Sequence, residues 1–204
     1  MKFPILFFFL VISVTGAYSQ TVYKDELGRV IGREAFEKKI IEGPYFGVPG
    51  ENPGEKIIVY RMPFGKVDPE IFYEKTGMQS ALVNGKSLVV IFYPGKDECN
   101  STGQHIKPSF LKKSHQSLLK WTEKRNAVEP VYLFKNPHGL EKYKGIMEWQ
   151  EDPEGIFEKE FFKYPYPCRS FVVIHPSGEY RAILGEFPDS QIDVALKILN
   201  KSSK

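Results

Sequence analysis

The sequence predicts an α/β domain in which helices flank a mixed β-sheet. Residues 87–93 (SLVVIFY) form an uninterrupted apolar run that ends at Pro94-Gly95, as is typical of a buried central strand. Further along, residues 171–174 and 179–184 flank the sequence His-Pro-Ser-Gly, which is a strand-turn-strand signal. A buried strand followed later by a hairpin indicates a sheet that mixes parallel and antiparallel pairs.

The segments around these strands follow a helical period. Residues 108–125 predict a helix, residues 128–134 a second strand, and residues 139–163 a partly helical stretch that is split at Pro153. Asp189 is the expected N-cap of a final helix. A helix between the first two strands predicts a parallel pair with a right-handed crossover, whereas the closing hairpin is antiparallel. We expect one shared core, made of Val90, Phe92, Leu118, Trp121, Val172, Ile174 and Leu196.

Residues 20–85 are less regular. Residues 33–42 (REAFEKKIIE) place three apolar side chains on one helical face, and residues 57–61 resemble a β-strand. Asp68-Pro69 begins a short helix that runs through Lys75, with Asp at the N-cap and Pro at the first position. We interpret residues 20–85 as an N-terminal α/β extension of a main domain that comprises residues 86–204.

The first 19 residues have the pattern of a signal peptide. Lys2 precedes an apolar stretch, residues 3–14, and Ala17-Tyr18-Ser19 ends in the small residues that signal peptidase recognises. The stretch is too short to span a bilayer alone, and the alternative is an uncleaved amino-terminal anchor. We expect an exported protein, periplasmic or extracellular, without a transmembrane segment after cleavage.

Composition excludes several classes of protein. The chain has 28 Lys and Arg against 25 Asp and Glu, a net charge of +3, which argues against a dedicated nucleic-acid binder. Two cysteines, Cys99 and Cys168, can build neither a disulfide-dense scaffold nor a four-thiolate zinc site. No phosphate-binding or dinucleotide-binding motif is present, so no cofactor is expected.

Residues 87–201 resemble a thioredoxin-like fold. Residues 168–180 (CRSFVVIHPSGEY), followed by Gly185 and the last helix, are similar to that superfamily's segment from the cis-proline loop through the hairpin. Residues 89–93 are similar to the strand that leads into its redox loop. The resemblance implies a mixed sheet flanked by helices and a redox loop that packs against the cis-proline loop.

The sequence departs from the superfamily where the redox chemistry resides. Thioredoxins carry Trp-Cys-Gly-Pro-Cys after that strand, whereas residues 94–100 read PGKDECN and hold only Cys99. Cys168 falls in the cis-proline loop, and counting back from Gly178 puts Arg169 at the position of the cis-proline. Dithiol exchange depends on a nearby resolving thiol. The resemblance therefore implies a degenerate member without the CxxC motif.

The two cysteines leave several hypotheses open. Export favours a disulfide, and the resemblance implies that Cys99 and Cys168 lie on loops that face each other. Such a disulfide is either a structural staple or an exchangeable bond, and Cys99 is alternatively peroxidatic. Two free thiols or a metal pair also remain. With His105, these cysteines would match the two thiolates and one histidine of copper-delivery proteins of this fold.

Other polar and aromatic residues carry weaker signals. His115 is expected on the wet face of its helix, and His175 at a strand end. Tyr164 and Tyr166 alternate with prolines and belong either to the core or to a recognition groove for a peptide or sugar. We expect a non-catalytic binding or interaction module with a protein or peptide partner. The alternatives are a thiol-disulfide or peroxide-handling redox protein and a copper-binding chaperone.

Overall fold

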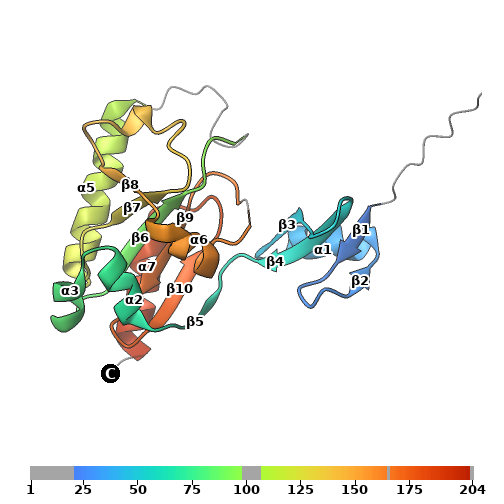
Figure 1. The fold of residues 1–204 in the computed structure, drawn as a ribbon, viewed down its shortest axis with the longest axis horizontal. Coiled ribbons are helices and arrows are strands. Elements are labelled where there is room, and N and C mark those ends of the chain that lie inside the picture. Colours follow the sequence, from blue (N-terminus) through green and yellow to red (C-terminus); the bar gives the residue numbers. More distant parts are fainter. Residues whose placement is uncertain (1–20, 98–106, 165, 203–204) are drawn as a thin grey trace, which may run out of the picture.

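The computed structural model describes residues 21–97, 107–164 and 166–202. These residues form a small four-stranded sheet with one helix and a larger six-stranded sheet with helices on both faces (Figure 1). None of the helices in the described part of the chain is both long and apolar enough to cross a membrane. The mixed sheet flanked by helices confirms the predicted fold class.

The larger sheet mixes parallel and antiparallel pairs as predicted. β6 and β7 are parallel and are joined through α5, whereas β9 runs antiparallel to β6 and forms a hairpin with β10. β8 adds a second parallel pair beside β7, within the stretch that we expected to be partly helical. In spatial order the strands are β5 (Phe64–Lys66), β10 (Glu179–Ile183), β9 (Ser170–Ile174), β6 (Leu88–Tyr93), β7 (Val131–Phe134) and β8 (Trp149–Glu151).

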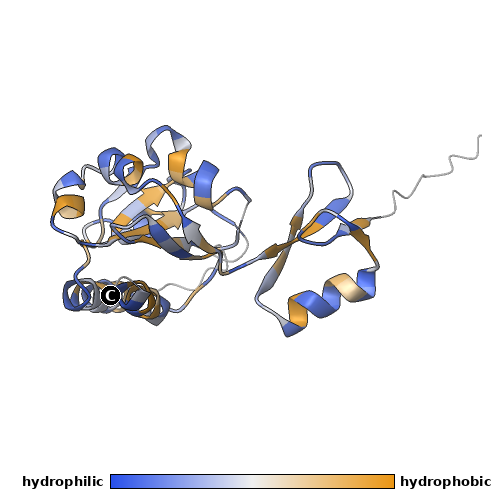
Figure 2. Ribbon diagram, turned by 90° about the horizontal axis from the view of Figure 1, so that it is seen from below, coloured by the Kyte–Doolittle hydropathy of each residue, from blue (hydrophilic) through white to orange (hydrophobic). Residues whose placement is uncertain are grey.

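Helices cover both faces of this sheet (Figure 2). The two long helices, α5 (Pro108–Lys124) and α7 (Ser190–Ser202), lie on one face. The short helices on the other face are α2 (Pro69–Lys75), α3 (Gln79–Val83) and α6 (Ile156–Phe161). Two single-turn 3-10 helices, η1 (Glu141–Tyr143) and η2 (Pro153–Gly155), interrupt the connection from β7 to α6.

The sheet divides the interior into two cores, so the expectation of one shared core is wrong. All six residues of β6 are buried, and alternate side chains point to opposite faces of the sheet. Val90 and Phe92 pack with the core under α2 and α6, where Val172 and Ile174 also lie. Leu118, Leu196 and the half-buried Trp121 lie in the other core, under α5 and α7.

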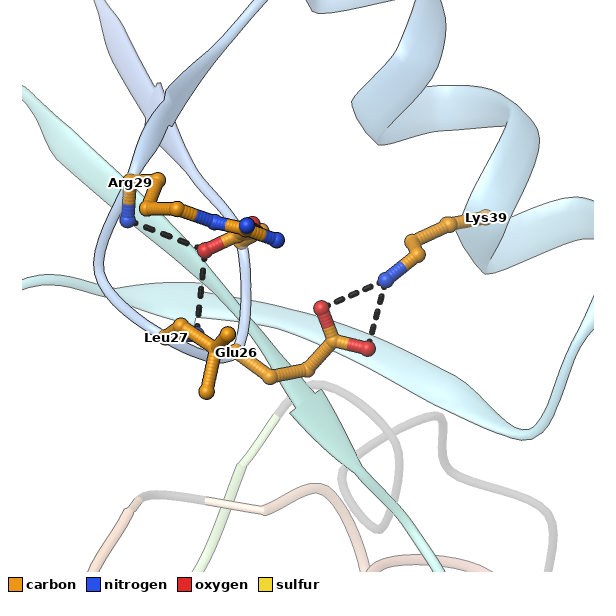
Figure 3. A network of polar contacts seen from close by, with 5 residues as sticks. Glu26, Leu27, Arg29 and Lys39 are labelled. Carbon is orange, nitrogen blue, oxygen red and sulfur yellow. Dashed lines mark hydrogen bonds and ion pairs between the residues drawn. The ribbon is translucent and has the colours of Figure 1, made fainter.

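The small sheet packs against the larger unit, because Val48 of the small sheet is buried in the core under α2 and α6. Its strands, in spatial order, are β2 (Val30–Ile31), β1 (Val22–Lys24), β4 (Glu55–Tyr60) and β3 (Tyr45–Pro49), and α1 (Arg33–Glu42) buries Phe36 against it. In the β1–β2 turn, one carboxylate oxygen of Asp25 accepts the backbone N–H groups of Leu27 and Arg29. Figure 3 shows this turn, with Glu26 paired to Lys39 of α1 beside it.

The larger sheet begins before residue 86, so our proposed boundary does not coincide with its edge. β5 pairs with β10, and α2 packs on the sheet through Phe72 and Tyr73. The Tyr73 hydroxyl donates to the carbonyl oxygen of Ile174 at 3.0 Å. Asp68 caps α2 as predicted, by accepting the backbone N–H of Glu70. The local cap was visible in the sequence, whereas the packing partner lies about a hundred residues further along the chain.

Candidate functional site

The loop before β9 contacts the loop that follows β6, through Cys168 and Asp97. The backbone N–H of Cys168 donates to Oδ2 of Asp97 at 2.7 Å. Cys168 is half-buried and has a φ of 64°, a left-handed conformation that non-glycine residues adopt at a cost. The contact joins the two loops that the thioredoxin resemblance predicted to be neighbours.

Two of the predicted site residues, Cys99 and His105, lie outside the described residues. The Cys99–Cys168 disulfide and the three-ligand copper site therefore stay predictions. Within the described ranges, no group of three or more His, Cys, Asp or Glu side chains is arranged to hold a metal ion.

Arg169 fixes the Cys168 loop to both long helices. Its Nη2 atom lies 2.5 Å from Oδ1 of Asp189, the residue directly before α7. The hydroxyl of Ser114 in α5 donates to the other oxygen of Asp189, and the guanidinium lies 5.0 Å from the centre of the Phe187 ring. The charge of Arg169 is thus already paired. No peptide bond in the described ranges is cis, including those at Arg169, the position expected for cis-proline.

Burial shifts the pKa values of two groups near this loop, Tyr93 and Lys142. Burial raises the pKa of Tyr93 to about 12, and the Tyr93 hydroxyl donates to the carbonyl oxygen of His138 at 2.9 Å. Burial also lowers the pKa of Lys142, and the positive charge of Arg169 lowers it further. A protonated phenol supplies no general base at neutral pH.

His115 is half-buried, so our expectation of a solvated face is wrong. Its Nδ1 atom lies 2.8 Å from the Tyr132 hydroxyl, and burial lowers the pKa of the imidazole. The reason is helical spacing, because Leu111, His115 and Leu118 are four and three residues apart and share the face of α5 that packs on the sheet. His175 lies in the hairpin turn at the end of β9, as expected, and its backbone N–H donates to the Glu179 carbonyl oxygen.

A cavity, which we call the tyrosine cavity, lies between the small sheet and the larger unit. It has a volume of about 310 Å³ and is lined by five aromatic rings, those of Tyr60, Phe161, Tyr164, Tyr166 and Tyr180. Tyr166 is buried and Tyr164 is half-buried, so both also contact the core. The two alternatives for these tyrosines are therefore compatible, because their rings fill the core on one side and face a cavity on the other.

Sequence reasoning missed Asp97, Tyr60 and Tyr180. Asp97 belongs to no motif, and its importance depends on a contact across 71 residues. Tyr60 ends β4 and Tyr180 lies in β10, so each looked like an ordinary strand residue. Their contribution to a cavity depends on how the two sheets pack.

The order and direction of β7, β6, β9 and β10 define a thioredoxin-like fold. Comparison of the sequence with protein-family models and with curated proteins finds no match. Among solved structures, the chain is similar to the Xanthomonas campestris bacterioferritin comigratory protein, which was studied for its alkyl peroxide reduction activity. The identity is 16%, the TM-score is 0.36, and the match covers 62% of this chain and 85% of that one.

Proposed function

We propose that this protein is an exported, non-catalytic binding module built on a thioredoxin-like fold and stapled by a Cys99–Cys168 disulfide. The observation that carries the proposal is the position of Asp97. Its carboxylate accepts the backbone N–H of Cys168 and places a negative charge beside that cysteine.

This environment opposes thiolate chemistry. Reactive cysteines have a lowered pKa because a helix N-terminus or an unpaired cation stabilises the thiolate. Here the first turn of α5 holds no cysteine, and Arg169 is paired with Asp189. A neighbouring carboxylate disfavours a second negative charge.

The same contact supports the disulfide. Cys99 follows Asp97 by two residues, and two residues of chain reach at most about 7 Å. Asp97 is held at Cys168, so the chain segment that carries Cys99 starts beside its proposed partner. The proposal of export rests on residues 1–19, which are outside the described part of the chain. The mass of the secreted protein tests it, since cleavage after Ser19 leaves residues 20–204.

An activity assay tests the non-catalytic function. The mature chain is mixed with dithiothreitol and either insulin or tert-butyl hydroperoxide, and disulfide reduction and peroxide consumption are followed. We expect rates equal to those of buffer with dithiothreitol. Turnover above that rate that is abolished in Cys99→Ser or Cys168→Ser, with the fold retained by circular dichroism, overturns the proposal.

A redox function is the second candidate, and the backbone of Cys168 favours it. Left-handed conformations at non-glycine residues are often found at functional sites, where neighbouring structure maintains the strain. In this alternative, thiol-disulfide exchange or peroxide reduction proceeds through Cys99 and Cys168. The assay above distinguishes the two functions directly.

A further inference from the structure

The contacts of Arg61 fix the small sheet against the larger unit beside the tyrosine cavity. The guanidinium of Arg61 lies 4.1 Å from the centre of the Phe46 ring of the small sheet. Its Nε and Nη2 atoms donate to the carbonyl oxygens of Leu184 and Glu186, at 3.2 and 2.6 Å. The backbone N–H of Leu184 returns a bond to the Arg61 carbonyl oxygen at 2.8 Å. These bonds join the end of β4 to the end of β10, so the cavity between them is preformed.

Phenol groups gather in this cavity without partners. In the described part of the chain, the hydroxyls of Tyr60, Tyr164, Tyr166 and Tyr180 make no hydrogen bond to another residue. Tyr166 is only 4% exposed, and burial raises the pKa of its hydroxyl, which therefore remains a neutral donor and acceptor. None of these four hydroxyl oxygens is among the buried polar atoms that lack a partner in the described residues, so they are open to water or to a ligand.

The aromatic rings that line the tyrosine cavity are oriented both face-on and edge-on to one another. Tyr164 and Tyr166 are nearly perpendicular, at 83° with their centroids 6.1 Å apart. Phe161 and Tyr180 form a second edge-on pair, with centroids 5.0 Å apart. A corner of aromatic rings, four of which carry a hydroxyl, matches a ligand that has an apolar face and a polar perimeter. A pyranose ring has this character, with axial C–H groups on its faces and hydroxyls around its edge.

The charges at the cavity balance. Glu26 is paired with Lys39 of α1, as Figure 3 shows, so its charge is neutralised. The other charged lining residues, Glu160 and Lys163, have opposite signs. A cationic or anionic ligand needs an excess of the opposite charge, which this lining does not offer. A neutral ligand avoids the cost of burying a charge without a partner.

We infer that the tyrosine cavity binds a neutral saccharide of one or two pyranose rings. The volume of about 310 Å³ is at the lower end of the range for small-molecule sites, which fits a ligand of this size. The inference deepens the proposed binding function by naming the class of ligand, and it rests on that function. The phenol hydroxyls donate to and accept from the sugar hydroxyls, and the rings stack on the C–H faces.

The test is titration calorimetry of the mature protein with maltose, cellobiose and N,N′-diacetylchitobiose. We expect measurable binding of at least one of the three. Tyr60→Phe with Tyr180→Phe removes two hydroxyls and keeps the rings, so the double variant should bind about tenfold more weakly. Tyr23→Phe is the matched control, because Tyr23 packs on Phe36 within the small sheet and does not line the cavity. It should bind like the unmodified protein.

Three outcomes overturn the inference. They are no heat of binding for any of the three sugars at millimolar concentration, an affinity that the double variant leaves unchanged, and tighter binding of an arginine-rich peptide than of any sugar. The peptide result would identify a cationic partner instead. Failure of the non-catalytic function is a separate result, because thiol-dependent turnover is measured without saccharide. A protein that binds sugar and also reduces peroxide would retain this inference and lose the first proposal.

Discussion

The carboxylate of Asp97 accepts the backbone N–H of Cys168 at 2.7 Å, across 71 residues of sequence. The two meet because β6 and β9 are antiparallel neighbours, with Phe92 opposite Ser170. The chain that leaves β6 and the chain that enters β9 are therefore at the same end of the sheet. A carboxylate that is bonded to a backbone donor positions the loop that contains Cys168.

Removing the Asp97 carboxylate should destabilise the protein. Asp97→Ala leaves the half-buried backbone N–H of Cys168 without this acceptor. We expect the free energy of unfolding to fall by about 1–2 kcal/mol. Asp97→Asn retains an acceptor oxygen and should lose less. Urea denaturation measures both values. Equal losses for the two variants would contradict the hydrogen bond as the cause.

The predicted disulfide has a direct chemical signature. The mature protein should contain no titratable thiol when it is denatured without reductant. Reduction should lower its free energy of unfolding by roughly 2–5 kcal/mol, because the cross-link constrains the unfolded chain. The double variant with Cys99→Ser and Cys168→Ser is the control, and reductant should not change its stability. Two free thiols in the denatured chain would show that the pairing is wrong.

Gly185 should tolerate alanine much less well than Gly28. Both glycines have a positive φ, 68° and 77°, so alanine carries a left-handed backbone cost of about 1–2 kcal/mol at either position. A Cβ at Gly185 would also lie 2.6 Å from the Phe46 ring, whereas nothing lies within 4 Å at Gly28. The stability loss by urea denaturation should therefore be clearly larger for Gly185→Ala. Similar losses of stability would mean that the Phe46 ring of the small sheet does not pack against Gly185.

His115 should make the protein less stable in mild acid. Burial lowers the pKa of His115 in the folded state, so the unfolded chain binds a proton first as the pH falls below about 6.5. The contribution of the neutral imidazole is present above that pH and is lost progressively below it. His115→Gln should have a shallower fall in melting temperature between pH 7 and pH 5. Gln116→Ala, a change at an exposed residue of the same helix that does not titrate, is the control and should follow the unmodified protein.

Local signals in the sequence predicted most of the individual elements. The helix predicted at residues 33–42 coincides with α1, because its apolar spacing and the following Gly43-Pro44 act within one segment. The buried strand β6, the hairpin of β9 and β10, and the Asp68 cap also depend on neighbouring residues alone. These features were sufficient to predict the fold class.

Relationships between distant segments were decided only by the tertiary structure. β8 is too short and polar to be distinguished from a loop, and its pairing with β7 makes it a strand. β5 likewise becomes part of the larger sheet through β10. The alternation of β6 side chains divided an expected single core into two. Each outcome depends on long-range pairing, which local sequence patterns do not encode.

For both candidate sites, too, the sequence determined one part and the tertiary structure decided the other. The sequence alone determined that the chain has two cysteines, no CxxC motif and a tyrosine-proline stretch before the last hairpin. The tertiary structure decided that Asp97 contacts Cys168 and that Tyr60 and Tyr180 join Tyr164 and Tyr166 around one cavity. Residue types and spacings are properties of the chain, whereas a hydrogen-bonded neighbour or a cavity wall exists only after sheet packing brings remote segments into contact.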